Sequence, residues 1–216
     1  MTINNVKTIK ILKKIMVKKS IIQKKVPFQK NILRTNMIML IIFGIIATTI
    51  SFLLDKIVLY FVIDNQYYVL EEFFRIITLI GETIPFIFIT ILIIVIFYYY
   101  KKPFTQIIYS TITSTIIGTI LKYLTLRPRP YEFLHIQSII STTYSSFPSG
   151  HARAVFTILP ILNNYFPKYK IYLWSIAILV AISRIYLSVH WLSDVVAGAF
   201  IGYIIGYFFV EVSKKI

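Results

Sequence analysis

The chain has 216 residues, which suits one domain, and combines 57% hydrophobic with only 14% charged residues. Soluble domains carry about 25% charged residues, so this composition excludes an ordinary soluble protein and predicts a membrane protein. The chain has no cysteine, which excludes a disulfide framework and a thiolate metal site. A net charge of +15 would suggest a nucleic-acid partner in a soluble protein, but the placement of the charges argues otherwise.

The basic residues concentrate at the N-terminus, where 10 of the 23 lie before position 35 and no acidic residue occurs. At helical period, Lys10, Lys14 and Lys18 share one side, and Ile11 and Ile15 share the other. We therefore predict that residues 1–35 form a basic amphipathic tail on the anionic cytoplasmic leaflet. A nucleic-acid-binding tail is the alternative, but no aromatic platform accompanies the lysines.

Residues 36–216 carry six apolar segments, which predict an all-α integral membrane bundle of six transmembrane helices. In chain order they are about Met37–Leu54, Ile76–Tyr100, Phe104–Leu126, Gly150–Phe166, Ile171–Val189 and Trp191–Val210. The second is interrupted by Gly81, Glu82 and Pro85, and the fourth is short and contains Pro160. The first is too long for a secretory signal core and has no cleavage motif after it, so we predict a retained span. The polar stretch Asp55–Arg75 could form an interfacial helix.

The charged connections alternate along the chain and predict the topology. The basic tail, the pair Lys101-Lys102, the neighbours Lys168 and Lys170, and the pair Lys214-Lys215 would be cytoplasmic by the positive-inside rule. The acidic link after the first segment, the long loop before Gly150 and the last turn would then face outward. We therefore predict that both termini are cytoplasmic. The richness in lysine and isoleucine suggests a bacterial source, for which we expect the inner membrane as the location.

The last outward turn holds Ser183-Arg184, five further residues, His190, three more residues, and Asp194. On a helix, His190 and Asp194 would be neighbours on one face. A carboxylate could then hold one ring nitrogen and leave the other free to attack, as in covalent catalysis. A helix start with a first-turn acid and an interfacial histidine would produce the same letters.

Two further clusters lie on the same predicted side of the membrane. Pro148-Ser149-Gly150-His151 opens a helical run, where free backbone N–H groups attract phosphate and His151 could donate a proton. Lys122 is followed after six residues by Arg129-Pro130, and two such cations suit a phosphate dianion. Taken alone, simple N-capping and interfacial snorkelling explain each of them as well.

Together the three clusters read K-x(6)-R-P, P-S-G-H and S-R-x(5)-H-x(3)-D, in this order. The set closely resembles the type-2 phosphatidic-acid phosphatase superfamily of membrane phosphatases, without a departure between Lys122 and Asp194. The resemblance implies a lipid phosphatase that works through a phosphohistidine and without a metal or other cofactor. It implies that His190 attacks phosphorus, Asp194 orients His190, and His151 protonates the leaving oxygen. It also implies that the phosphate is bound by Lys122, Arg129, Ser149, Gly150 and Arg184.

The motifs recognise phosphate and leave the lipid open. An undecaprenyl diphosphate or phosphatidylglycerophosphate type of substrate fits the small size, and a lipid A phosphatase fits the motifs equally well. A lipid phosphotransferase with the same site is an alternative, and so is a non-catalytic anion-binding or transport protein. The partners implied are the lipid phosphate and the surrounding membrane lipids, without nucleic acid; the oligomeric state stays open.

A few other residues receive weaker assignments. Arg127 and Arg153 could reach the lipid headgroup, and Tyr186 could line the pocket, whereas His135 is more typical of a solvated loop. Gly198, Gly202 and Gly206 recur at four-residue steps, which puts them on one helix face. We interpret this stripe as packing that fixes the catalytic turn, because small residues permit close helix contact.

Overall fold

The computed structural model describes residues 35–134 and 145–214, and their regular secondary structure is entirely helical. The first helix is Thr35–Asp64. The elements after it are α2 (Tyr68–Thr78), the 3-10 helix η1 (Leu79–Gly81), α3 (Thr83–Tyr99), α4 (Thr105–Thr125), α5 (Pro130–Phe133), α6 (Gly150–Tyr165), the 3-10 helix η2 (Pro167–Tyr169), α7 (Lys170–Tyr186) and α8 (Leu192–Ser213). The predicted basic tail lies outside the described residues, apart from Thr35.

Among the described residues, four segments are long and apolar enough to cross a membrane, namely Thr35–Asp64, Thr105–Phe133, Pro167–Tyr186 and Leu192–Ser213. A bent pair, Tyr68–Gly81 with Thr83–Tyr99, would be a fifth if it acts as one span. α6 has 16 residues, fewer than the about 20 that the hydrocarbon core requires. The all-helical membrane prediction is therefore confirmed, with four or five segments meeting the length criterion in place of the predicted six.

The first helix and the segment after it differ in length from the predicted ones. The first helix continues ten residues beyond the predicted end at Leu54, because no glycine or proline interrupts residues 55–64. The proposed interfacial helix Asp55–Arg75 is thus divided between the first helix and α2. By contrast, the predicted interruption near Gly81 is real: Glu82 is extended (ψ 147°), and the bent pair turns by 54° there.

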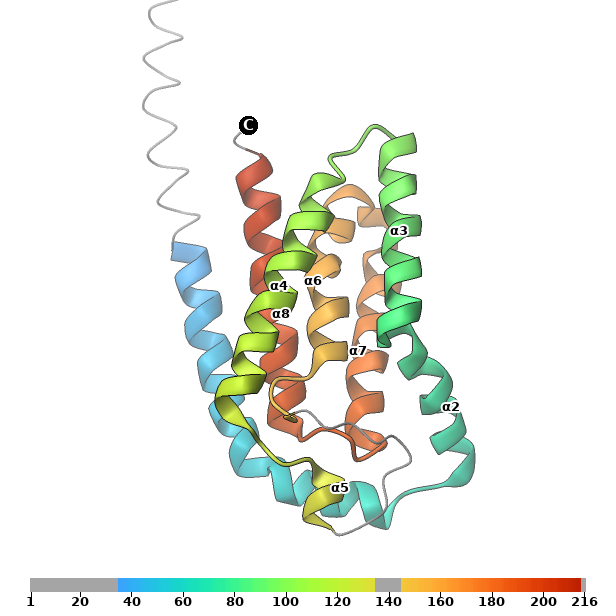
Figure 1. Cartoon of the computed structure of the whole chain (residues 1–216), viewed down its shortest axis with the longest axis vertical. Coiled ribbons are helices and arrows are strands. Elements are labelled where there is room, and N and C mark those ends of the chain that lie inside the picture. Colours follow the sequence, from blue (N-terminus) through green and yellow to red (C-terminus); the bar gives the residue numbers. More distant parts are fainter. Residues whose placement is uncertain (1–34, 135–144, 215–216) are drawn as a thin grey trace, which may run out of the picture. The chain divides into compact units, whose positions relative to one another are not determined.

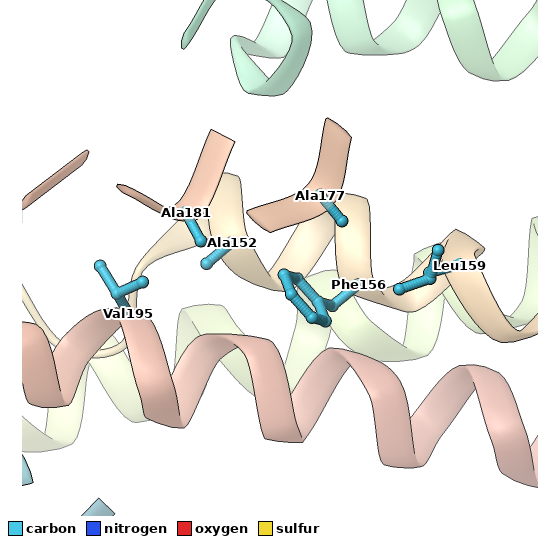
Figure 2. Close-up of a cluster of buried hydrophobic side chains, with 6 residues drawn as sticks. All are labelled: Ala152, Phe156, Leu159, Ala177, Ala181 and Val195. Carbon is cyan, nitrogen blue, oxygen red and sulfur yellow. The ribbon is translucent and has the colours of Figure 1, made fainter. Parts of the chain in front are cut away.

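α6 contacts α8, α7 and α4, and Figure 1 shows these helices running alongside one another. On the side that faces α7 and α8, Ala152, Phe156 and Leu159 pack with Ala177, Ala181 and Val195 (Figure 2). Toward the other end, Ile158 and Ile161 of α6 pack with Phe97, Ile107 and Val210. α6, the short fourth segment of the sequence prediction, is consequently covered best among α4, α6, α7 and α8.

The glycine stripe of α8 lies directly against the backbone of α6. A Cβ atom added to Gly198 would lie 2.5 Å from the carbonyl oxygen of Ser149, and Cβ atoms at Gly202 and Gly206 would overlap the carbonyl oxygens of Arg153 and Thr157. Only glycine permits this approach, because the obstruction is backbone and cannot rotate away. The packing role predicted for the stripe is confirmed, and it brings the starts of α6 and α8 together.

Candidate active site

The first predicted cluster lies where α4 ends. α4 terminates at Leu126 in the left-handed region (φ 44°), and Pro128 and Pro130 prevent the helix from continuing. Lys122, in the last turn, donates from Nζ to the carbonyl oxygen of Ser145 at 2.7 Å. Arg129 is buried and donates from Nη1 to the carbonyl oxygen of Val189 at 3.0 Å. The two cations therefore reach the segments that carry the other two clusters.

The second cluster opens α6. Ser149 occupies the N-cap position but does not cap the helix with its side chain, and its fully buried Oγ has no hydrogen-bond partner among the described residues. Its backbone N–H donates to the carbonyl oxygen of Asp194 at 2.9 Å. A Cβ atom added at Gly150 would meet none of the described residues within 4 Å apart from its chain neighbours and its own helix, so they leave space open at the helix start. Simple N-capping by Ser149 is thus not observed, and a buried hydroxyl is left for an oxyanion.

The third cluster lies in the turn between α7 and α8. Arg184 is 2% exposed, and its Nη1 donates to Thr78 Oγ1 at 2.5 Å. Its Nε has no hydrogen-bond partner within the part of the chain that the structure describes. The carbonyl oxygen of Arg184 accepts the backbone N–H groups of Val189 (3.3 Å) and His190 (3.1 Å). These bonds fold the chain back after α7, so that the arginine and the histidine of the motif come from one tight turn.

His190 and Asp194 are close, although they do not share a helix as expected. His190 precedes α8, whereas Asp194 lies in its first turn, where Oδ2 accepts the backbone N–H of Trp191 at 2.9 Å. His190 Nδ1 is 3.5 Å from Asp194 Oδ2. Ser146 Oγ donates to the same carboxylate oxygen and lies 3.4 Å from Nδ1. Asp194 therefore both caps the helix and faces the imidazole on the side of Nδ1, so Nε2 is the ring nitrogen that does not face the carboxylate.

Burial lowers the pKa of His190 well below its usual value of 6.5. The positive charges of Arg184, Arg129 and Lys122 lower it further, in that order, and His151 adds a smaller contribution. These electrostatic neighbours belong to all three motifs, so the motifs meet around His190. The negative charge of Asp194, 3.5 Å from Nδ1, does not outweigh these effects. The histidine is held neutral, which is the form that can act as a nucleophile.

His151, in the first turn of α6, faces the break between α2 and α3. Its Nε2 lies 3.2 Å from Glu82 Oε1, an ion-pair distance, although the two groups are not aligned as a hydrogen bond. A Cβ atom on Gly81 would lie 2.8 Å from His151 Cδ2, so the glycine at the break lets the ring approach. The sequence singled out Gly81 and Glu82 as a helix interruption, and the structure gives this interruption a second role beside His151.

Three residues with weaker assignments make their contacts inside the protein. Arg153 is buried and donates from Nη1 to Ser114 of α4 at 2.8 Å. Tyr186 accepts the backbone N–H of Tyr67 at 2.9 Å, which ties α7 to the start of α2. Arg127 lies between two carboxylates, those of Asp55 and Asp194. His135 lies outside the described residues.

Sequence reasoning missed Asp55, Ser146 and Ser193, which surround Asp194 and its arginine. Ser146 stands two residues before the P-S-G-H motif, and Ser193 stands directly before Asp194, so adjacency was the one available signal. Within residues 35–134 and 145–214, no group of three or more histidine and acidic side chains is arranged to hold a metal ion.

Similarity to known proteins agrees with this arrangement. Over 117 residues the chain is 32% identical to an undecaprenyl-diphosphatase of Sulfolobus acidocaldarius, covering 53% of this chain and 57% of the relative. Over 101 residues it is 29% identical to a lipid A 1-phosphatase of Rhizobium johnstonii, covering 44% and 41% respectively. The chain thus spans about half the length of the curated relatives it matches.

The fold is similar to that of a solved structure, a transmembrane PAP2 type phosphatidylglycerolphosphate phosphatase from Bacillus subtilis. The TM-score is 0.70 at 25% sequence identity, and the match covers 83% of this chain and 96% of the other. Residues 103–216 match the PAP2 superfamily, and this range contains all three motifs. Because the match extends over more than half of the chain, the protein belongs to the PAP2 superfamily.

Proposed function

We propose that the protein is a membrane lipid phosphatase that removes phosphate from a lipid phosphate monoester or diphosphate through a phosphohistidine. The observation that carries this proposal is the grouping of a buried neutral histidine, His190, with a carboxylate 3.5 Å from its Nδ1 and three cations from two of the motifs. Ser149 Oγ and Arg184 Nε are both buried and have no hydrogen-bond partner within residues 35–134 and 145–214. Buried polar groups without partners are costly, which favours a site shaped for an oxyanion.

In the first step, the lone pair of His190 Nε2 attacks phosphorus and forms a P–N bond. The P–O bond to the lipid breaks, and its electron pair leaves with the oxygen, which takes a proton from His151. Asp194 faces Nδ1 at 3.5 Å, so its negative charge stabilises the positive charge that the imidazole acquires. The dephosphorylated lipid leaves as an alcohol, or as a monophosphate when the substrate is a diphosphate.

In the second step, a water molecule attacks the phosphohistidine and gives a proton to His151. The P–N bond breaks, its electron pair returns to His190, and inorganic phosphate is released. The same histidine thus acts as the acid in one step and as the base in the other. In a phosphotransferase, an acceptor alcohol would take the place of water at this step.

Lys122, Arg129, Arg184, Ser149 and the N–H of Gly150 are the groups that we assign to the phosphate oxygens. Arginine offers a planar pair of donors and lysine a point charge, so together they can neutralise a phosphoryl dianion. This fixed charge would provide the stabilisation that a metal ion provides in other phosphatases. We therefore propose a metal-independent reaction.

The similarity to an undecaprenyl-diphosphatase and to a phosphatidylglycerolphosphate phosphatase supports a lipid of one of these two types. Lipid A is the alternative substrate, supported by the similarity to a lipid A 1-phosphatase. A non-catalytic anion-binding protein is a weaker alternative, since anion binding alone would require neither histidine.

We further propose an orientation and a span count. The site would face the outer side of a bacterial inner membrane, because the lysine pairs at the opposite helix ends favour the cytoplasm. α6 would be the sixth span, since its neighbours α4, α7 and α8 cover it and compensate for its short length. Residues 1–35 would lie on the inner leaflet as a basic segment attached to the domain formed by 36–216.

Purified protein in detergent, with EDTA present, tests the proposal on a panel of lipid phosphates. The panel contains undecaprenyl diphosphate, phosphatidylglycerophosphate, phosphatidic acid and lipid A, with free phosphate as the readout. We expect release from at least one member, and the relative kcat/KM values would identify the lipid. Addition of acceptor alcohols distinguishes a phosphotransferase, which would transfer phosphate and release less of it. Binding of phosphate without turnover on any member would contradict the proposal.

A further inference from the structure

Arg127 joins two buried carboxylates that come from distant parts of the chain. Its Nη1 lies 2.6 Å from Asp194 Oδ1, and its Nη2 lies 2.6 Å from Asp55 Oδ2, on the first helix. Asp55 is 5% exposed and Asp194 is fully buried. A guanidinium in this geometry holds both carboxylates in fixed directions, so the position of Asp194 depends on the first helix.

Ser193 closes this network on the side of α8. Its backbone N–H donates to Asp55 Oδ1 at 2.8 Å, and its hydroxyl donates to Asp55 Oδ2 at 2.6 Å. The same hydroxyl accepts a bond from Arg127 Nη1 at 2.7 Å. Asp55 thereby holds both the arginine and the first turn of α8, the turn that carries Asp194.

Aromatic rings cover the arginine. The Cζ atom of Arg127 is 4.6 Å from the ring centroid of Phe52 and 5.2 Å from that of Trp191. Trp191 is itself fixed, because its Nε1 donates to the carbonyl oxygen of Pro128 at 2.9 Å. Such a covered network has a low local dielectric, in which the charge balance among its members matters more than at a wet surface.

The two carboxylates and the one guanidinium carry a net charge of −1. If Asp55 were removed, Arg127 would have Asp194 as its remaining acidic partner and would neutralise it. His190 would then face a carboxylate held in a changed direction, with less negative charge to balance the imidazole as it takes up the phosphoryl group. None of Asp55, Arg127 and Ser193 is among the groups assigned to the phosphate, so substrate binding would be little affected.

We propose that Asp55 is a positioning residue for the nucleophile, acting through Arg127 and Ser193 to keep Asp194 directed at His190. The inference rests on the proposed function, in which His190 attacks phosphorus. It extends the active site from the three motifs to the first helix, outside the range that matches the family.

The test compares Asp55→Asn with Asp64→Asn, a matched change at an exposed acid at the end of the same helix. We expect Asp55→Asn to lower kcat about 10- to 100-fold, the size of effect that a misplaced reacting group produces, with KM within about threefold of wild type. Asp64→Asn should leave both constants unchanged. An unchanged kcat in Asp55→Asn, or a loss that appears entirely in KM, would overturn the inference.

A double variant separates positioning from general stabilisation. If Asp55 acts through Asp194, then Asp55→Asn should reduce kcat much less in an Asp194→Asn background than in wild type. Equal reductions in both backgrounds would overturn the inference. Should Asp55→Asn not fold, Asp55→Glu replaces it, with the same expected loss in kcat and the same contradicting result. Absence of wild-type turnover on every lipid would instead contradict the proposed function.

Discussion

Ser149 donates its backbone N–H to the backbone carbonyl of Asp194 at 2.9 Å, which bonds the P-S-G-H motif directly to the histidine-aspartate motif. The bond is possible because Gly198, one turn after Asp194, lets α8 approach the start of α6. The relative position of the two motifs is thus set by backbone contact between two helices. It does not depend on the conformation of a flexible side chain.

Substitution of Gly202 by alanine should destabilise the protein while leaving the motif residues unchanged. The new Cβ would overlap the carbonyl oxygen of Arg153, and the backbone of α6 can yield only by moving away. We expect a loss of about 1–3 kcal/mol, the usual cost of overpacking, together with reduced activity. Thermal unfolding in detergent measures the change. Gly150→Ala is the folding control, because its new Cβ would meet no described atom within 4 Å apart from its chain neighbours and its own helix. Equal stability of Gly202→Ala and wild type would contradict the packing argument.

The two histidines should differ in the step that they block. His190→Ala should abolish turnover and phosphoenzyme formation, because the attacking nitrogen is lost. His151→Ala should slow departure of a poor leaving group, yet accumulate a phosphoenzyme with a substrate whose leaving group needs no protonation. Rapid quench with a 32P-labelled substrate of this kind detects the acid-labile, base-stable P–N bond. Near-native activity of His190→Ala would show that another group is the nucleophile.

The motif residues of this site could be singled out from the sequence, because their residue types and their spacing are typical of phosphate chemistry. The local partners of the motifs were harder to predict. Asp55 lies 72 residues before Arg127, and no periodicity connects a polar residue of the first helix to a loop arginine. Glu82 was interpreted only as part of a helix interruption. Its proximity to His151 could not be predicted, because His151 lies on another helix. The apolar runs predicted which segments are helical. The first helix nevertheless continues beyond its predicted end, because charged residues alone do not terminate a helix.

The low pKa of His190 should be visible directly. Its folded value lies well below 6.5, near which a free histidine titrates, so the neutral form persists as the pH falls through 6.5. The chain has three histidines, which allows assignment of their NMR signals through His135→Gln and His151→Gln variants. We expect the signals of His190 to remain those of the neutral ring at pH 6. Titration at or above 6.5 would contradict the cationic environment described for it.

The lowered pKa of His190 also predicts how the stability of the protein depends on pH. Because the folded pKa is lower than the unfolded one, the unfolded state takes up the proton first as the solution becomes acidic. The contribution of His190 to stability is therefore fully present above about pH 6.5 and is lost progressively below it. Thermal unfolding of wild type and His190→Gln between pH 5 and 8 isolates this contribution, and the difference between them should shrink toward pH 5. A difference independent of pH would contradict it.

The proposed orientation can be tested by cysteine labelling, since the native chain has no cysteine. Tyr68 and Lys168 are both exposed. Tyr68 lies near the end of α7 that leads to His190, because the N–H of the preceding residue, Tyr67, donates to Tyr186. Lys168 lies at the other end of α7, in η2. In intact cells an impermeant maleimide should label Tyr68→Cys and should label Lys168→Cys only after lysis. The reverse pattern would place the site in the cytoplasm.

Activity should survive EDTA, and vanadate should inhibit. Three cations that act on His190, namely Lys122, Arg129 and Arg184, can neutralise the phosphoryl oxygens as they rearrange during transfer. Vanadate can accept a nitrogen ligand and adopt a five-coordinate form, so it should bind where the phosphoryl group is transferred, competitively with the lipid. His190→Ala should lose most of this inhibitor binding, measured by calorimetry, because the axial nitrogen is gone, whereas the exposed-site variant Asp64→Asn should retain it. Loss of turnover in EDTA that magnesium restores would overturn the metal-independent reaction. Vanadate binding that is equal in wild type and His190→Ala would show that the cations bind the anion without any bond to the histidine.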